Sequence, residues 1–138
     1  MPQITGLDHV GIAVASIDDA MPLYRDVLGL DHLGTEEVPG QKARIALFRV
    51  GETAVELLES TTQDGPIAEH IRKRGEGFHH IAFRVGDIEI ALKRCSESGI
   101  RLINREPVAG AHGSLIAFLH PASTGGVLIE LCQPEGGT

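Results

Sequence analysis

Several short runs of the chain are mostly apolar, which is typical of strands with at least one buried face. The clearest runs are residues 45–50, 54–59, 114–120 and 126–131. Between the strand-like runs lie segments with helical spacing of their apolar residues. The pattern therefore predicts an α+β protein built from short strands and a few helices.

Three helices are expected from their start and stop signals. One begins near Asp18, a second spans about Pro66 to Arg74, and a third begins after Asp87. Aspartate favours the position before the first helical turn because its carboxylate accepts hydrogen bonds from unpaired backbone amides. Gly29 and Gly99 lie where the first and third helices should end.

The chain contains an internal repeat. Residues 7–24 match residues 78–95, and later in each half residues 50–59 match residues 124–133. Each half begins with a β-rich run, continues with a helix and closes with further strands. The repeat therefore predicts two copies of a β-α-β-β-β module.

The boundaries of the predicted modules follow from the repeat. Module 1 spans about residues 4–60, a linker helix lies within about 61–77, and module 2 spans about 78–133. We expect residues 1–138 to form a single domain, because the chain is long enough for one respectable core. The two modules should contribute to one mixed sheet that curls around a shared cleft.

Two histidines and two glutamates occupy equivalent positions in the repeat. His9 matches His80, and Glu56 matches Glu130. Each glutamate lies inside an apolar strand, where a lone carboxylate costs several kcal/mol unless it is paired or bound to a metal. Two imidazoles and two carboxylates would neutralise one divalent cation, and this donor set suits Co, Ni, Mn, Zn or Mg. We therefore predict one divalent metal ion held by these four residues.

Composition and charge exclude several classes of function. The net charge of −7 and the pI near 5.4 disfavour nucleic acid and anionic membranes as partners. No apolar run approaches the length of a membrane span, and the N-terminal residues lack the pattern of a signal peptide. We expect a cytoplasmic protein in which Cys95 and Cys132 remain thiols. The scarcity of aromatic residues argues against flavin or haem.

The paired modules, with one ligand pair from each, resemble the vicinal-oxygen-chelate superfamily along essentially the whole chain. Within it, the closest likeness is to methylmalonyl-CoA epimerases. The most specific segments are residues 66–85 and the HPxxxGGVLIEL pattern at the end of the chain. The resemblance implies the glyoxalase fold around a metal cleft, the same four metal ligands, and a homodimer.

The resemblance also implies a reaction. These epimerases invert C2 of methylmalonyl-CoA by removing a proton and returning it to the other face through a metal-stabilised enolate. Glu130 is the first candidate for proton transfer and Glu56 the second. Some relatives carry a separate base in a strand where the nearest residue here is Arg44. The second base is therefore either a metal-bound carboxylate, which we favour, or a loop residue such as Glu36 or Glu37.

Substrate-binding residues are expected among the remaining polar side chains. Arg44 is either a solvated strand residue or a contact for an anionic part of the substrate, and His112 and His120 are weaker candidates for substrate contacts. The coenzyme A phosphates call for cations, and Lys73 is the leading candidate. A solvated surface would explain the same charges, which also include Lys42, Arg72 and Arg74.

Three other functions compete with the epimerase. Lactoylglutathione lyase resembles the same ligand set, but three segments do not look like that enzyme: residues 64–75, the AHG stretch at 111–113 and the HPxxxGGVLIEL ending. An extradiol dioxygenase would use two histidines and one carboxylate, so Glu56 argues against it. A non-enzymatic small-molecule binding protein of the same fold would not need the metal ligands.

Overall fold

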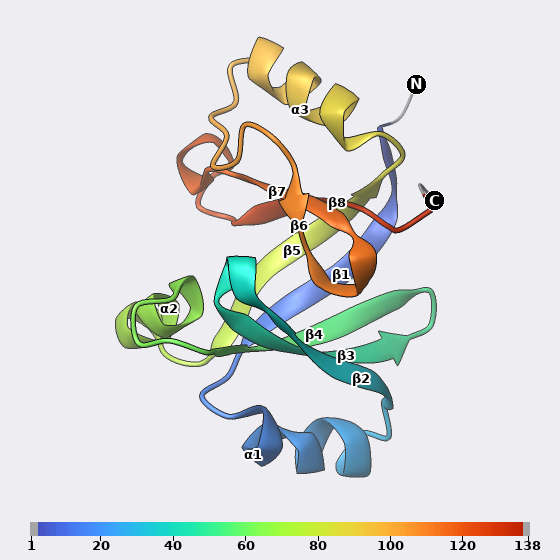
Figure 1. The fold of residues 1–138 in the computed structure, drawn as a ribbon, viewed down its shortest axis with the longest axis vertical. Coiled ribbons are helices and arrows are strands. Elements are labelled where there is room, and N and C mark those ends of the chain that lie inside the picture. The colour runs from blue at the N-terminus through green and yellow to red at the C-terminus, as the bar shows by residue number, and fades with distance from the viewer. Residues whose placement is uncertain (1–2, 137–138) are drawn as a thin grey trace. The chain divides into compact units, whose positions relative to one another are not determined.

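The structure is a computed structural model that describes residues 3–136. Its backbone contacts divide the described residues into two compact units, residues 9–79 and a second unit made of residues 3–8 and 80–136. Each unit contains one of the predicted modules (Figure 1). The prediction of two β-α-β-β-β modules in an α+β fold is confirmed. The grouping of both modules into a single domain stays a prediction.

The unit of residues 9–79 holds a mixed sheet in the order β2-β3-β4-β1. Its strands are β1 (Ile4–Ala13), β2 (Asp31–Val38), β3 (Ala43–Val50) and β4 (Thr53–Ser60). Strands β2, β3 and β4 pair antiparallel, whereas β1 and β4 run parallel. The parallel pair requires a long connection between β1 and β4, which the first helix and two strands supply.

The other unit repeats this arrangement in the order β5-β8-β7-β6. Its strands are β5 (Gly77–Val85), β6 (Val108–Ala109), β7 (Leu115–Leu119) and β8 (Ile129–Gln133). Strands β5 and β8 run parallel and β8, β7 and β6 pair antiparallel. The match of strand order and direction explains why the two halves of the sequence look alike.

The first helix differs from its prediction at its start. Ser16, not Asp18, is the N-cap, and its hydroxyl accepts a hydrogen bond from the Asp19 amide at 3.1 Å. The helical segment begins as α1 (Ile17–Met21) and continues as a π-helical turn from Pro22 to Val27. Ser16 lies closer to the end of β1 than Asp18 does, so the helix begins two residues earlier than predicted, soon after the strand ends.

The other two helices follow the sequence signals. Helix α2 spans Pro66–Arg74, and helix α3 spans Ile88–Glu97 after the Asp87 N-cap. The Asp87 carboxylate accepts hydrogen bonds from the Glu89 and Ile90 amides, both at 3.1 Å. Gly99 follows α3 with a positive φ of 84°, a conformation that glycine adopts without steric cost.

Each sheet buries one face against its own helix. In one unit Ile17 and Met21 of α1 pack against Ala46, Phe48 and Leu57 of β3 and β4.

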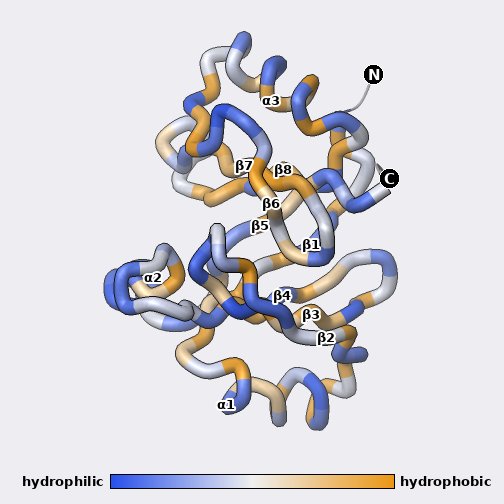
Figure 2. Tube along the Cα trace, viewed as in Figure 1, coloured by the Kyte–Doolittle hydropathy of each residue, from blue (hydrophilic) through white to orange (hydrophobic). Residues whose placement is uncertain are grey.

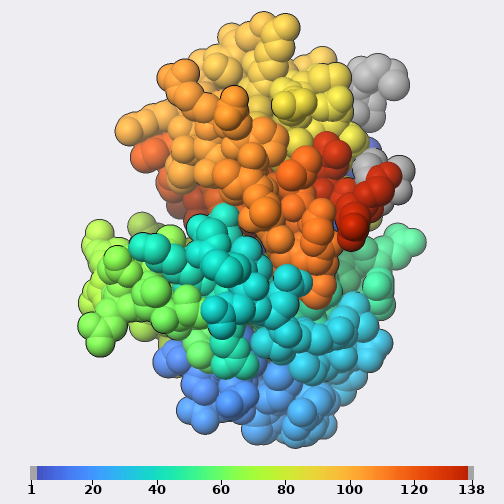
Figure 3. Space-filling view, viewed as in Figure 1, coloured from blue at the N-terminus to red at the C-terminus, as the bar shows by residue number. Residues whose placement is uncertain are grey.

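Helix α3 of the other unit has one apolar and one polar side. Hydrophobic and hydrophilic turns alternate along it in Figure 2, and it forms part of the surface in Figure 3. The helix-covered face forms a hydrophobic core in each unit.

The α3 unit has an equivalent core. Ile88, Ala91 and Leu92 of the helix pack against Ala117 and Leu131 of the sheet. No helix within residues 3–136 combines the length and the apolar character that crossing a bilayer requires.

The starts of α1 and α3 are each held by a side chain three residues beyond a predicted metal ligand. In β4 the Glu59 carboxylate accepts a hydrogen bond from the Ile17 amide at 2.7 Å. In β8 the Gln133 side-chain oxygen accepts one from the Ile88 amide at 2.9 Å. Both amides lie in the first turn of a helix, where no intrahelical acceptor exists. The same strands therefore carry the predicted ligands and anchor the helices.

This anchoring predicts a measurable loss of stability. Gln133→Ala and Glu59→Ala should each lower the free energy of unfolding by about 1–2 kcal/mol, because a first-turn amide loses its acceptor. Chemical denaturation of each variant measures the change. Glu52→Ala, in an exposed turn, is the control and should stay within about 0.5 kcal/mol of the parent. Equal stability of all three variants would contradict the anchoring role.

Candidate metal-binding residues in the two units

One predicted pair of ligands lies in the unit of residues 9–79. The His9 Nε2 and Glu56 Oε1 atoms are 3.3 Å apart. Glu56 of β4 lies directly opposite Gly11 of β1, and His9 precedes Gly11 by two residues. Because side chains alternate along a strand, His9 and Glu56 lie on the same face of the sheet. The parallel pairing of β1 and β4 therefore brings this pair together.

The second pair repeats this arrangement in the other unit. The His80 Nε2 and Glu130 Oε1 atoms are 3.1 Å apart. Glu130 of β8 lies opposite Ala82 of β5, two residues beyond His80. The His80 ring also contacts Phe118 edge to face, with ring centroids 5.5 Å apart. Phe118 limits the positions that the imidazole can take.

All four side chains are buried. The exposed fraction is 3% for His9, His80 and Glu130 and 7% for Glu56. Both pairs lie on the face that the helices leave uncovered, because the neighbouring residues of the same strands, Leu57 and Leu131, belong to the helix-packed cores. A buried carboxylate requires a compensating charge or hydrogen bond, and here each one has an imidazole beside it.

The donor set fits a divalent metal ion. With neutral imidazoles, the two pairs together carry two buried negative charges, which one divalent cation would neutralise. Imidazole nitrogen and carboxylate oxygen are ligands for borderline and hard cations. Each unit thus holds one nitrogen donor and one oxygen donor of this kind.

A buried thiol, Cys132, lies two residues beyond Glu130 on β8. Burial, together with the carboxylates of Asp8 and Glu130, raises the pKa of the Cys132 thiol far above its usual value. Asp8 also accepts a hydrogen bond from Arg84 Nε at 3.2 Å. A thiol binds metals as the thiolate, so this environment favours the predicted role of Cys132 as a small apolar residue. Sequence reasoning missed the Asp8 to Arg84 contact, because these residues lie far apart in the chain.

The predicted substrate residue Arg44 lies on the other face of its sheet. Arg44 of β3 is opposite Glu59 of β4, and its Nη1 atom is 3.5 Å from Glu59 Oε2. Glu59 faces α1, since it accepts the Ile17 hydrogen bond. The structure therefore does not place Arg44 beside the Glu56 carboxylate.

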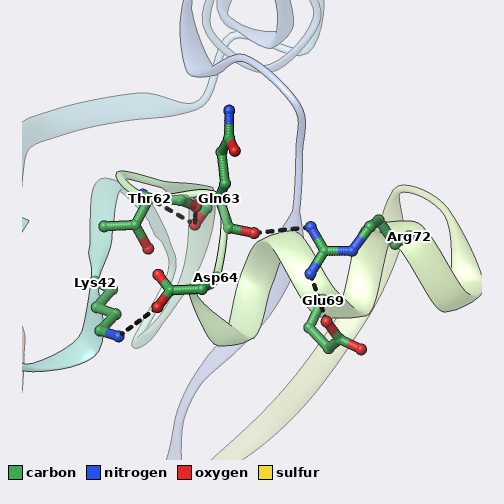
Figure 4. Close-up of polar contacts among 7 residues, drawn as sticks. Lys42, Thr62, Gln63, Asp64, Glu69 and Arg72 are labelled. Carbon is green, nitrogen blue, oxygen red and sulfur yellow. Dashed lines mark hydrogen bonds and ion pairs between the residues drawn. The ribbon is translucent and has the colours of Figure 1, made fainter.

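The basic residues that were predicted to bind the coenzyme A phosphates lie on α2 or beside it, and acidic side chains lie next to them (Figure 4). Lys73 Nζ is 3.2 Å from a Glu69 carboxylate oxygen, and Arg72 contacts the same carboxylate. Arg72 Nη1 also donates a hydrogen bond to the Gln63 carbonyl at 2.8 Å, and Lys42 Nζ lies 3.3 Å from Asp64. These pairs are exposed, so a phosphate could replace their carboxylate partners at little cost.

The two histidines that were predicted as weaker substrate contacts differ in backbone conformation. His112 has φ 55° and ψ 38°, in the left-handed region, within the turn Ala111–Gly113. Such a conformation is uncommon for a residue with a side chain and is found at functional sites as well as in tight turns. His120 instead caps a short turn, where its Nδ1 accepts a hydrogen bond from the Ala122 amide.

Comparison of the sequence with known proteins identifies the family of this chain. The profile of the Glyoxalase/Bleomycin resistance protein/Dioxygenase superfamily matches residues 8–118. The chain is 46% identical to the uncharacterized protein YqjC of Bacillus subtilis, over 94% of this chain and 93% of that protein. It is 36% identical to the mitochondrial methylmalonyl-CoA epimerase of Bos taurus, over 92% of this chain and 73% of that protein.

A solved structure extends the likeness to the fold. A methylmalonyl-CoA epimerase in complex with methylmalonyl-CoA and NH4+ is 34% identical, with a TM-score of 0.93 over 97% of both chains. The glyoxalase fold and the resemblance to methylmalonyl-CoA epimerases that the sequence predicted are both confirmed. The chain belongs to the Glyoxalase/Bleomycin resistance protein/Dioxygenase superfamily.

Proposed function

We propose that this protein is a methylmalonyl-CoA epimerase that inverts the configuration of C2 by removing a proton and returning it to the other face. The observation that carries the proposal is the buried histidine and glutamate pair, present once in each unit. It occurs in a chain that is similar to methylmalonyl-CoA epimerases along nearly its whole length. Carboxylates suit this reaction because a thioester acidifies the adjacent C–H bond and a nearby carboxylate can accept the proton.

The proposal includes one divalent metal ion held by His9, Glu56, His80 and Glu130. The duplication of the pair, its burial and its donor chemistry support this assignment. When bound, the ion would supply Lewis acidity toward the substrate oxygens and stabilise the negative charge that develops there. The donor set is compatible with Co, Ni, Mn, Zn or Mg.

Proton transfer is assigned first to Glu130 and second to Glu56. Glu130 is 3% exposed and has the His80 imidazole on one side, so its carboxylate is held in one orientation. A fixed carboxylate at a water-poor position transfers a proton without first reorganising solvent.

Substrate binding is assigned to Lys73 and His112. Lys73, on the exposed side of α2, would bind a coenzyme A phosphate by exchanging the Glu69 carboxylate for it. The left-handed conformation of His112 is the observation that favours a substrate contact at the turn Ala111–Gly113. The pairing of Arg44 with Glu59 gives Arg44 a structural role instead.

We also propose a homodimer that functions in the cytoplasm. The homodimer rests on the resemblance to the epimerases. The cytoplasmic location is carried over from the sequence analysis, and the free thiols Cys95 and Cys132 are compatible with it.

Solvent deuterium exchange tests the reaction. In deuterium oxide the protein should exchange the C2 proton of methylmalonyl-CoA, and NMR or mass spectrometry would follow the label. The hemithioacetal of glutathione is the control substrate, and its conversion should stay at the uncatalysed rate. Turnover of the hemithioacetal in place of exchange at C2 would assign the protein to the lactoylglutathione lyases.

The metal assignment is tested by His80→Ala. The variant should lose bound metal and epimerase activity together, with activity reduced about 100-fold or more, because a buried ligand has been removed. Elemental analysis measures the metal and circular dichroism checks the fold. His79→Ala changes the neighbouring residue, which faces the other way and contacts His70, and it should retain its metal. Full metal occupancy in His80→Ala would remove His80 from the ligand set.

The role of Lys73 is tested by its effect on KM. Lys73→Ala should raise the KM for methylmalonyl-CoA about five-fold, which corresponds to about 1 kcal/mol of lost phosphate binding. A truncated N-acetylcysteamine thioester has no phosphates, so its KM should not change. Lys93→Ala on α3 is the matched control. An equal rise in KM for both substrates would show that Lys73 does not bind the phosphates.

A further inference from the structure

A cavity of about 540 Å³ opens beside helix α3, away from every residue assigned above to metal or substrate binding. All of its lining residues belong to α3 or to the segment of residues 100–107, so the cavity lies within the α3 unit. Ligand pockets in proteins typically measure about 300–1,000 Å³. The cavity is therefore large enough to hold a small molecule.

The repeat departs from its symmetry at this cavity. In the unit of residues 9–79, the chain enters the eight-residue strand β2 two residues after Gly29. After the equivalent Gly99, residues 100–107 stay outside the named strands, and only the two residues of β6 pair with β7. A segment that would otherwise extend the sheet instead lines a cavity together with α3.

Hydrogen bonds hold this segment in place. The Arg101 amide donates to Ser123 Oγ at 2.9 Å, and the Ile103 amide donates to the Phe118 carbonyl at 2.9 Å. The Phe118 amide in turn donates to Asn104 Oδ1 at 2.8 Å. The wall is thus formed before any ligand binds, which lowers the ordering cost of binding.

Apolar side chains form one part of the cavity lining. Leu92 of α3 is 3% exposed, and Ile100 and Leu102 are half-buried and pack against the core of the α3 unit. An apolar group that entered the cavity would leave water and contact these side chains, which is favourable.

Charged side chains form the other part of the lining. Helix α3 contributes two carboxylates and one ammonium group, and the segment contributes two guanidinium groups and one carboxylate. These residues are Glu89, Lys93 and Glu97 on the helix and Arg101, Arg105 and Glu106 on the segment. The helix wall therefore has a net charge of −1 and the segment wall a net charge of +1.

These six side chains leave their charges unpaired. Within residues 3–136 none of them forms an ion pair or a side-chain hydrogen bond. On α2, in contrast, Lys73 lies 3.2 Å from the Glu69 carboxylate at a spacing of four residues. Lys93 has a glutamate at the same spacing on both sides and pairs with neither. The charges around the cavity are therefore available to a ligand.

Two walls of opposite net charge match a ligand that carries both signs. A simple anion would leave the carboxylates of α3 without a partner, and a simple cation would leave the guanidinium groups of the segment without one. A zwitterion satisfies both walls at once. The apolar part of the lining adds the requirement for an apolar group on the same molecule.

We propose that this cavity binds a free apolar α-amino acid. The guanidinium groups of Arg101 and Arg105 bind its carboxylate, and the carboxylates of Glu89 and Glu97 accept hydrogen bonds from its ammonium group. Its side chain lies against Leu92 and the neighbouring apolar residues. This inference does not depend on the proposed epimerase reaction.

The test is a titration of the full chain with L-leucine as the probe, followed by NMR of the backbone amides of residues 89–107. Three analogues each lack one feature: 4-methylpentanoate has no ammonium group, 3-methylbutylamine has no carboxylate, and L-serine has no apolar side chain. Leucine should give saturable shifts at these amides. Each analogue should bind about ten-fold more weakly or worse, because one part of the lining loses its partner.

Matched variants locate the site. Arg105→Gln should raise the Kd for leucine about five-fold or more, and Arg101→Gln serves the same purpose if that variant fails to fold. Arg94→Gln removes the same charge from an exposed position of α3 outside the cavity lining and should keep the parental Kd.

Three outcomes would overturn the proposal. The absence of saturable shifts with leucine would show that the cavity does not bind amino acids. Equal affinity for 4-methylpentanoate would show that the ammonium group is not recognised, and the ligand would then be an apolar anion. An equal loss of affinity in Arg94→Gln and Arg105→Gln would show that leucine binds elsewhere or responds only to the overall charge.

Discussion

A carboxylate inside an apolar sheet is the constraint on which this structure depends. Glu56 and Glu130 are both less than a tenth exposed, and their neighbours along the strands are core residues. Burial of such a charge costs several kcal/mol unless a partner compensates it. In each unit that partner is a histidine on the adjacent parallel strand. The parallel pairs β1 with β4 and β5 with β8 are therefore as much a part of the candidate site as the four side chains.

The two faces of each sheet have different roles, one in packing and one in carrying the histidine and glutamate pairs. One face packs against α1 or α3 and forms the core, and its residues Glu59 and Gln133 hold the first turns of those helices. The other face carries the histidine and glutamate pairs. Alternate residues of one strand point to opposite faces of the sheet. A shift of one residue in strand register would therefore bury the wrong side chains and also separate each histidine from its glutamate. Stability and the candidate site are thus linked through the same strands.

The repeat is close at some register positions and differs at others. His9 with Glu56 and His80 with Glu130 occupy equivalent register positions in the two units. Glu36 and Val108, in contrast, are equivalent by position and opposite in chemistry. Cys132 differs from its counterpart Leu58 as well, although its raised pKa keeps it an uncharged thiol.

The amino-acid sequence by itself determined the modules, the helices after Pro66 and Asp87, the family and the two histidine and glutamate pairs. The spacing of apolar residues and the internal repeat carry that information, because local hydrogen bonding and burial determine which residue types neighbouring positions accept. Only the tertiary structure decided that Ser16 and not Asp18 is the helix cap, and that Arg44 pairs with Glu59. It also decided which face of the sheet Glu36 and Glu37 each occupy. Each of these depends on which residues of distant strands lie opposite each other, and a sequence does not state its own strand register.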